Sequence, residues 1–211
     1  MKASSSETGA YVRPPVVDSI KLGTALGLGA AWAIFGLVLA AGAQLGLPPG
    51  TFYEMIGLSL GQVEEWSAIY LGFGLHMLTG AIIGIIYMII SDQVKWFRTF
   101  STAKWFGTGV ATGIVVWAIL FVPLHFLVVK STIQNALDLT TPSDSDTTLR
   151  LERLNQMSDS ILYGSLGMHL VFGSILGLLG RIFTSSRDSV MQETKRRTGV
   201  TRKQDNTSAS A

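Results

Sequence analysis

Four long stretches without a charged residue constrain the fold of this 211-residue chain more than any other feature of its sequence. They cover residues 22–47, 66–91, 105–129 and 161–180. Each reaches the roughly 20 residues that a helix needs to cross the hydrocarbon core of a bilayer. Only 14% of the chain is charged, whereas soluble domains average about 25%. The sequence therefore predicts an all-α integral membrane protein, a bundle of four helices.

The four runs divide the chain into segments. We predict a flexible cytoplasmic N-terminus, a first transmembrane hairpin, a cytoplasmic linker, a second transmembrane hairpin and a disordered basic cytoplasmic tail, over residues 1–19, 20–91, 92–104, 105–183 and 184–211. The second hairpin includes an outer loop over 130–160. Disorder is expected in the tail because it holds too few apolar residues to form a core.

The basic residues lie unevenly about the four runs. Of the 16 Lys and Arg, only Lys130, Arg150 and Arg153 fall in the loops after the first and third runs, so 13 fall on the other side. The positive-inside rule then places both termini in the cytoplasm and the protein in the cell membrane. With 6 acidic residues inside and 8 outside, the two sides carry about +7 and −5, so the overall charge of +2 indicates no nucleic-acid partner.

The second half of the chain repeats the first. The segment SAIYLGFGLHMLTGAIIGIIY at 67–87 aligns without gaps to SILYGSLGMHLVFGSILGLLG at 160–180, sharing S-x2-Y-x3-G-x-H-x3-G-x3-G at an offset of 93. The preceding runs also match, because GTALGLGAAWAIF at 23–35 resembles GTGVATGIVVWAILF at 107–121. Each unit holds two spans, so both copies enter the membrane from the same side. The sequence predicts two parallel helical-hairpin repeats related by a pseudo-twofold axis along the membrane normal.

The outer loops contain signals for short helices. Thr51 with Glu54 three residues later forms a capping-box pattern. It opens a segment whose Phe52, Tyr53 and Met55 suit the bilayer interface. A second helix is expected to start near Thr147 and to lead into the fourth span. We expect these elements to form an outer cap.

His76, His125 and His169 are the only side chains in the four runs that titrate near neutral pH. Carboxylate relays and di-iron sites within the membrane are thereby excluded. The chain also lacks a P-loop, a G-x-S-x-G elbow and an H-E-x-x-H motif, so no sequence motif indicates an enzyme. The chain has no cysteine, which removes thiolate metal sites.

Two of the histidines share a helix face with glycines. The predicted helix-packing glycines are Gly80 and Gly84 beside His76, and Gly173 and Gly177 beside His169. Their spacing of four residues puts each set on one stripe of a helix. Small residues four apart let a neighbouring backbone approach closely, so we expect both histidines to point into the bundle.

Three interpretations of the histidines are open. In the first, each neutral imidazole donates a hydrogen bond across a helix interface, and no cofactor is bound. In the second, His76 and His169 ligate a shared haem b, or all three histidines, with His125, bind copper or zinc. In the third, the histidines line a path for a small solute or a proton.

The functional expectation follows from these interpretations. We expect a structural or accessory subunit of a membrane complex, or a homo-oligomer, so its partners are the lipid bilayer and itself or other membrane subunits. A haem b- or metal-binding electron-transfer subunit and a small channel or transporter are the alternatives.

The repeated G-x-H-x3-G-x3-G helix also resembles a family. Together with the run GTGVATGIVVWAI, it is similar to a group of small four-helix multi-pass membrane proteins of archaea and bacteria. The resemblance covers roughly residues 20–183 and implies fold and location only, because that group has no activity to transfer. The longer, more acidic outer loops and the longer basic tail depart from the group's pattern.

Overall fold

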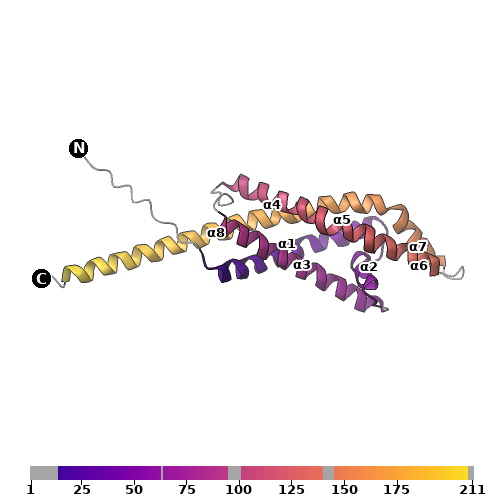
Figure 1. Ribbon diagram of the computed structural model, residues 1–211, viewed down its shortest axis with the longest axis horizontal. Coiled ribbons are helices and arrows are strands. Elements are labelled where there is room, and N and C mark those ends of the chain that lie inside the picture. Colours follow the sequence, from indigo (N-terminus) through magenta and orange to yellow (C-terminus); the bar gives the residue numbers. More distant parts are fainter. Residues whose placement is uncertain (1–13, 63, 95–100, 140–144, 209–211) are drawn as a thin grey trace.

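The computed structural model describes residues 14–62, 64–94, 101–139 and 145–208, and these contain helices and no strands. Four helical spans are long and apolar enough to cross a membrane, which confirms the four predicted spans (Figure 1). They are α1 (Val16–Gln44), α3 (Glu65–Gln93), the third span Thr102–Leu139, and Ser158–Arg187 within α8 (Ser158–Ser208). Each span begins before its uncharged run, and all but α1 also continue beyond the end of that run.

The third span contains two π-helical segments. It consists of α4 (Thr102–Val116), the π-helical η2 (Trp117–Phe121), α5 (Val122–Leu124), the π-helical η3 (His125–Val129) and α6 (Lys130–Leu139). Pro123 lies in the short α5 between the two π segments. A proline inside a helix lacks the N–H of the usual hydrogen bond, and wider turns beside it accommodate the loss. His125 is the first residue of the second π segment.

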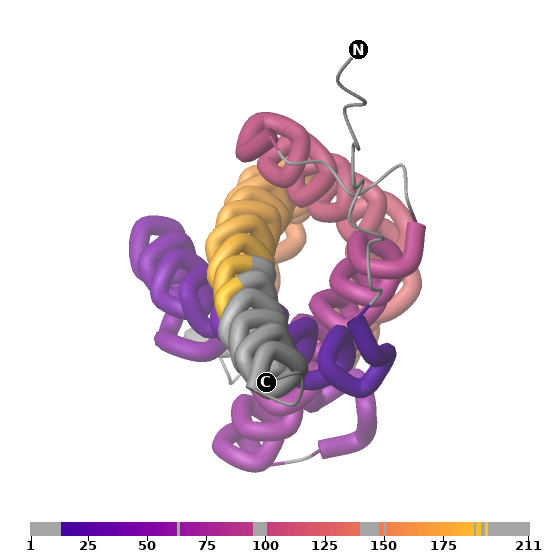
Figure 2. The backbone as a smooth tube through the Cα atoms, turned by 90° about the vertical axis from the view of Figure 1, so that its left-hand side faces the viewer, coloured from indigo at the N-terminus to yellow at the C-terminus, as the bar shows by residue number. Residues whose placement is uncertain are grey.

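The four spans pack as two helix pairs. α1 packs on α3, α4 packs on α8, and α8 also contacts α1. Viewed along the bundle, α8 lies between the first hairpin and α4 (Figure 2). The main core takes residues from all four spans, namely Leu26, Ala30, Ala31, Ile34, Ile83, Tyr87, Met88, Trp105, Phe172 and Leu176. One apolar core therefore joins the two pairs.

Tyr87 and Trp105 connect α3 to α4 at the inner end of the bundle. The Tyr87 hydroxyl donates to the Trp105 carbonyl at 3.2 Å and lies 3.0 Å from the Thr108 hydroxyl. The two rings meet edge to face, and Trp105 is buried. This contact satisfies polar groups between helices that the hydrophobic core alone would not pair.

A second core closes the outer end, as the prediction of an outer cap requires. Here α2 (Thr51–Ser59), α6 and α7 (Ser145–Gln156) come together (Figure 1). The buried residues are Leu47, Met55, Ile133, Leu154 and Ile161. The predicted outer loop over 130–160 is thus largely helical in its described part.

The short helix α2 forms where it was expected, but two details of that prediction are wrong. Gly50, with φ of 89°, precedes the helix in place of a capping Thr51, whose hydroxyl donates to the Pro48 carbonyl at 2.8 Å. α2 also packs into the bundle instead of along the bilayer interface, because Gly72 of α3 lets the Tyr53 backbone approach until a Cβ would overlap it. Tyr53 is consequently buried.

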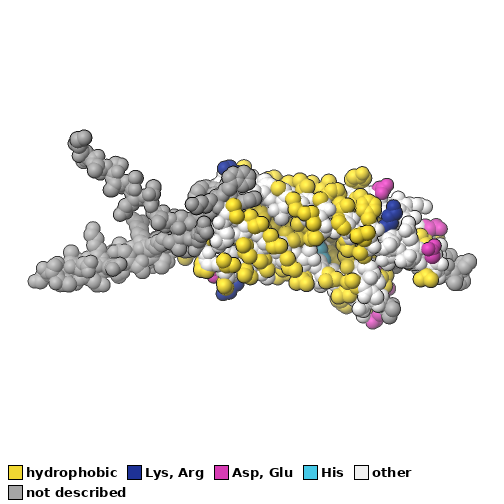
Figure 3. Space-filling view, viewed as in Figure 1, with side chains coloured by type: hydrophobic (Ala, Val, Ile, Leu, Met, Phe, Trp, Pro, Cys, Tyr) yellow, Lys and Arg dark blue, Asp and Glu magenta, His cyan; other side chains and the backbone are white. Residues whose placement is uncertain are grey.

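The surface separates apolar and charged side chains. On the face in view, hydrophobic side chains cover most of the middle of the bundle, and acidic side chains gather at the end formed by α6 and α7 (Figure 3). This arrangement agrees with the charge division inferred from the sequence.

The predicted disorder of 184–211 differs from the structure, in which α8 continues as a helix to Ser208. No proline and a single glycine occur between 184 and 208. Because the spanning part of α8 already provides the nucleus, each further residue extends a helix without the cost of starting one. Residues 209–211 of the predicted tail, 1–13 of the predicted N-terminus and 95–100 of the predicted linker lie outside the described residues.

Candidate functional site

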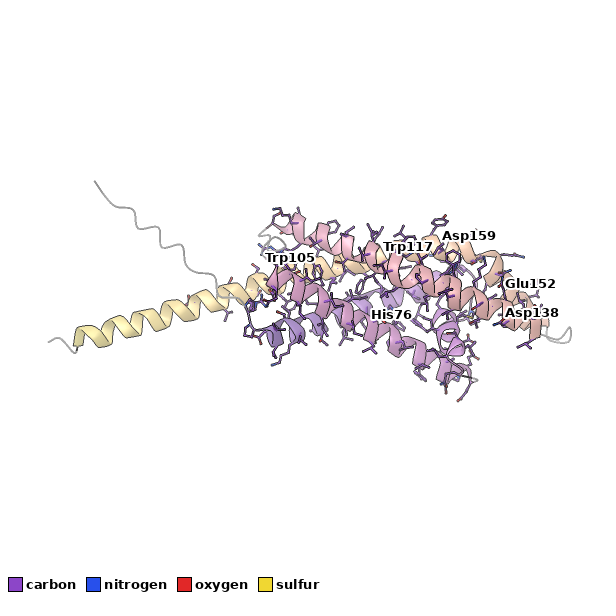
Figure 4. All side chains as sticks on the ribbon, in the orientation of Figure 1. His76, Trp105, Trp117, Asp138, Glu152 and Asp159 are labelled. Atoms are coloured by element: carbon purple, nitrogen blue, oxygen red, sulfur yellow. The ribbon has the colours of Figure 1, made fainter. Side chains whose placement is uncertain are left out.

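The three histidines lie toward the outer half of the bundle, on three different spans. His76 is on α3 (Figure 4), His125 opens η3 and His169 is on α8. We call them, with the side chains they contact, the histidine cluster: His76, His125, His169, Tyr53, Phe121 and Ser158.

His76 joins α3 to α1. Its Nε2 lies 3.3 Å from the Ala31 carbonyl oxygen, which only accepts hydrogen bonds, so Nε2 carries the proton. The ring meets the Tyr53 ring of α2 at 5.5 Å between centroids. The imidazole therefore pairs a backbone carbonyl across a helix interface, as the first interpretation requires.

His169 uses the other ring nitrogen and stays within its own helix. Its Nδ1 donates to the Ser165 carbonyl one turn earlier at 2.8 Å, which leaves Nε2 as the acceptor. The ring lies 5.4 Å from that of Phe121. His76 and His169 are therefore bonded differently.

His125 is the most deeply buried of the three, with 1% of its surface exposed. Its Nε2 lies 3.0 Å from the Ser158 hydroxyl at the start of α8, which is also buried. Its Nδ1 has no hydrogen-bond partner among the described residues. No pattern in the sequence indicated the pairing of Ser158 with His125, because a serine at a helix start is frequent for reasons of capping alone.

The three histidines do not converge on one point in the described chain. No three His, Cys, Asp or Glu side chains come together there as a group that could hold a metal ion. His125 bonds Ser158 while His76 and His169 bond backbone carbonyls. Each histidine thus has a hydrogen-bond partner within the protein.

The glycines beside the histidines form close backbone contacts between the spans. Gly80 and Gly84 of α3 lie against Gly27 and Gly23 of α1. In the second pair, Gly173 and Gly177 of α8 lie against Gly109 of α4, and Gly113 lies against the His169 backbone. At these contacts a Cβ in place of a glycine hydrogen would overlap backbone atoms of the other helix.

The glycine contacts lead to a different alignment of α1 with α4 from the one predicted from the sequence. The sequence alignment paired Trp32 with Trp117, 85 positions apart, whereas the shared contact geometry pairs Gly27 with Gly109, 82 positions apart. The tryptophans also differ in environment, since Trp32 is exposed and Trp117 donates to the Ser165 hydroxyl at 3.0 Å. The glycine contacts, more than the tryptophans, determine how the helices correspond.

A second polar group lies at the inner end of the bundle and was missed in the sequence. Asp92, at the end of α3, is 3% exposed and accepts a hydrogen bond from Ser19 of α1 at 2.7 Å. Arg187 of α8 binds the same carboxylate with both terminal nitrogens, at 2.6 and 3.1 Å. In the sequence, Asp92 directly follows the second uncharged run and Arg187 comes shortly after the fourth. Both charges are therefore expected near the same end of the bundle, which was the available signal. Asp92, Ser19 and Arg187 tie three spans together.

Comparison of the chain with family profiles, curated proteins and solved structures finds no match.

Tyr53 provides a test of how the cluster is packed. Its hydroxyl is buried without a hydrogen-bond partner among the described residues, and burial raises the pKa of Tyr53 to about 12. A tyrosine in the unfolded chain ionises near pH 10. Stability should therefore fall between about pH 10 and pH 12, where the unfolded chain loses this proton and the folded chain keeps it.

We expect Tyr53→Phe to leave the free energy of unfolding unchanged or to raise it by about 1 kcal/mol, because it removes an unpaired buried hydroxyl and keeps the ring contacts. The decrease in stability between about pH 10 and pH 12 that Tyr53 causes should disappear in this variant. Unfolding of the detergent-solubilised protein at pH 8 and pH 11 measures both effects. Tyr70→Phe is the matched control, since Tyr70 is exposed. A destabilised Tyr53→Phe protein at pH 8 would show that the hydroxyl has a partner.

Proposed function

We propose that this chain is a multi-pass protein of the cell membrane, with both termini in the cytoplasm, that serves as a structural or accessory subunit of a membrane complex or forms a homo-oligomer. The observation that carries the proposal is that each intramembrane histidine is bonded by the protein itself: His76 to the Ala31 carbonyl, His125 to the Ser158 hydroxyl and His169 to the Ser165 carbonyl. The bonds of His76 and His125 join different spans, and polar contacts of this kind hold helices together. His169 is bonded within α8.

The glycine contacts support the two-repeat arrangement within this proposal. Gly27 with Gly80 and Gly109 with Gly173 make equivalent close approaches in the two helix pairs. Two similar hairpins side by side favour a parallel repeat about an axis along the membrane normal. The orientation rests on the 13 Lys and Arg on one side of the spans against 3 on the other.

The third span is the surface on which we expect another chain to pack. In its most apolar window 11% of the residues are buried, against 28% to 33% for the other three spans. Its exposed side chains include Val115, Ile119 and Leu127. A span so little covered by its own bundle offers the largest area for a neighbouring transmembrane helix.

Cross-linking tests the association directly. The chain contains no cysteine, so Ile119→Cys introduces the only thiol. We expect Ile119→Cys in native membranes to cross-link to a second copy or to a partner subunit, while Ile86→Cys, on the exposed side of α3, does not. A chain that stays monomeric in mild detergent and forms no adduct from Ile119→Cys would contradict the proposal.

A haem b subunit is the second candidate, because one observation favours it. His169 donates from Nδ1 to the Ser165 carbonyl, which leaves its Nε2 available as an axial ligand of haem iron. His76 fits less well, since its Nε2 is bonded to the Ala31 carbonyl across the interface. Ligation through that nitrogen would require the cross-helix bond to break.

A further inference from the structure

A groove of about 600 Å³ opens between α1 and α8 at the inner end of the bundle. It is lined by Asp18, Lys21, Leu22, Phe183, Ser186, Arg187 and Val190. Its volume lies in the range of small-molecule sites. The groove is separate from the histidine cluster, and the inference drawn from it rests on the membrane location and orientation given in the proposed function.

The groove crosses the boundary between headgroups and hydrocarbon. On α1 the uncharged run begins at Leu22, directly after Lys21. On α8 Phe183 follows the apolar run, and Ser186 and Arg187 come one turn later. The groove therefore presents Leu22 and Phe183 on the membrane side and charged and polar side chains on the cytoplasmic side. Val190, one turn beyond Arg187, adds an apolar side chain at the cytoplasmic edge. A molecule that fits this order has an apolar chain and a polar head.

The charged side chains of the groove indicate which polar head the bound molecule has. Arg187 is bound to the buried Asp92 through two hydrogen bonds, so its positive charge is balanced within the protein. Asp18 and Lys21, three residues apart on one face of α1, are both exposed and form no ion pair with each other or with another described residue. One negative and one positive side chain remain, which is the complement of a head that carries both charges.

We propose that this groove binds a phospholipid of the inner leaflet whose head carries a phosphate and a primary ammonium, that is, a phosphatidylethanolamine. The phosphate faces Lys21, the ammonium donates hydrogen bonds to the Asp18 carboxylate, and an acyl chain lies on Leu22 and Phe183. A choline head has no N–H and cannot donate to Asp18. A phosphatidylglycerol head offers hydroxyl donors but no positive charge to pair with the Asp18 carboxylate.

Lipid retention by the full-length protein tests the site. The purified chain in mild detergent is incubated with phosphatidylethanolamine, phosphatidylcholine or phosphatidylglycerol of identical acyl chains, and bound lipid is counted by native mass spectrometry. We expect about fivefold tighter binding of phosphatidylethanolamine than of either other lipid, the effect of one exposed charge pair. Asp18→Asn should remove the preference over phosphatidylcholine, and Lys21→Gln should weaken binding of all three lipids about threefold.

Lys104→Gln is the matched control for charge. It removes one cation from the same side of the protein at an exposed position outside the groove, so lipid binding should not change. Equal retention of phosphatidylethanolamine and phosphatidylcholine by the unmodified chain would overturn the proposal. A preference for phosphatidylglycerol, or an unchanged preference in Asp18→Asn, would overturn it as well.

Discussion

Replacing Gly27 by alanine is expected to destabilise the protein by about 3 kcal/mol, because the new methyl group would occupy the position of the Gly80 carbonyl oxygen. The obstacle is backbone on both sides, so no side chain can move away. α1 and α3 would have to separate over the whole glycine contact, including Gly23 against Gly84. The cross-helix bond from His76 to Ala31 lies one turn further along and would lengthen at the same time.

The second hairpin should respond equally. Gly109→Ala would place a methyl group on the Gly173 carbonyl oxygen in the contact between α4 and α8. Each helix supplies its own control, because a Cβ at Gly36 of α1 or at Gly107 of α4 has no atom within 4 Å. Gly36→Ala and Gly107→Ala should therefore leave the free energy of unfolding unchanged or raise it, since alanine favours a helix over glycine. Unfolding of all four variants in detergent measures the differences.

Two outcomes would contradict this account of the glycine contacts. If Gly27→Ala were as stable as Gly36→Ala, α1 and α3 would not approach as closely as the structure shows. If Gly27→Ala destabilised the protein and Gly109→Ala did not, the two pairs would not be equivalent, which would remove support for the repeat.

Replacing Asp92 by asparagine is expected to cost about 2 to 3 kcal/mol, because it leaves the Arg187 guanidinium without its anionic partner at a largely buried position. We place the value below that of a fully buried pair, since the Arg187 side chain is 20% exposed and water can reach it. The hydrogen bond from Ser19 would also meet a weaker acceptor. The variant should loosen the junction of α1, α3 and α8 at the inner end.

A double-mutant cycle separates the ion pair from other effects. Asp92→Asn, Arg187→Gln and the double variant should give a coupling energy above about 1 kcal/mol, because the two side chains lie in direct contact. Asp18→Asn removes an exposed carboxylate from the same end and should change stability by less than about 0.5 kcal/mol. Additive effects of Asp92→Asn and Arg187→Gln would show that the pair is not formed.

The sequence was sufficient for the spans because their signal is local. An uncharged run of more than 20 residues needs no tertiary information to be read as a spanning helix. The glycine stripes at Gly80 and Gly84 were also readable from spacing. Their partners were not named, although Gly23 and Gly27 repeat the same spacing on the preceding helix. A search for matching small-residue stripes on both helices of a hairpin would have found them.

The parts that the sequence did not provide depend on contacts between distant residues. Asp92 and Arg187 are 95 positions apart, and each taken alone has the sequence context of a solvated loop charge. Tyr53 was assigned to the bilayer interface because its neighbours are amphipathic. The decisive feature is Gly72 on another helix, which makes room for the α2 backbone. The different bonding of His76 and His169 was equally hidden, since their sequence contexts are nearly the same.

The central claim is that the membrane histidines are structural, and an absorption spectrum with metal analysis of the mildly solubilised protein tests it most directly. We predict no Soret band and no metal in stoichiometric amount. His76→Ala and His169→Ala should keep the assembly mass of the unmodified chain, with a loss of stability of about 1 to 2 kcal/mol each from the removed hydrogen bonds. A Soret band in the unmodified protein that disappears in either variant would contradict the claim and establish His76 and His169 as haem ligands.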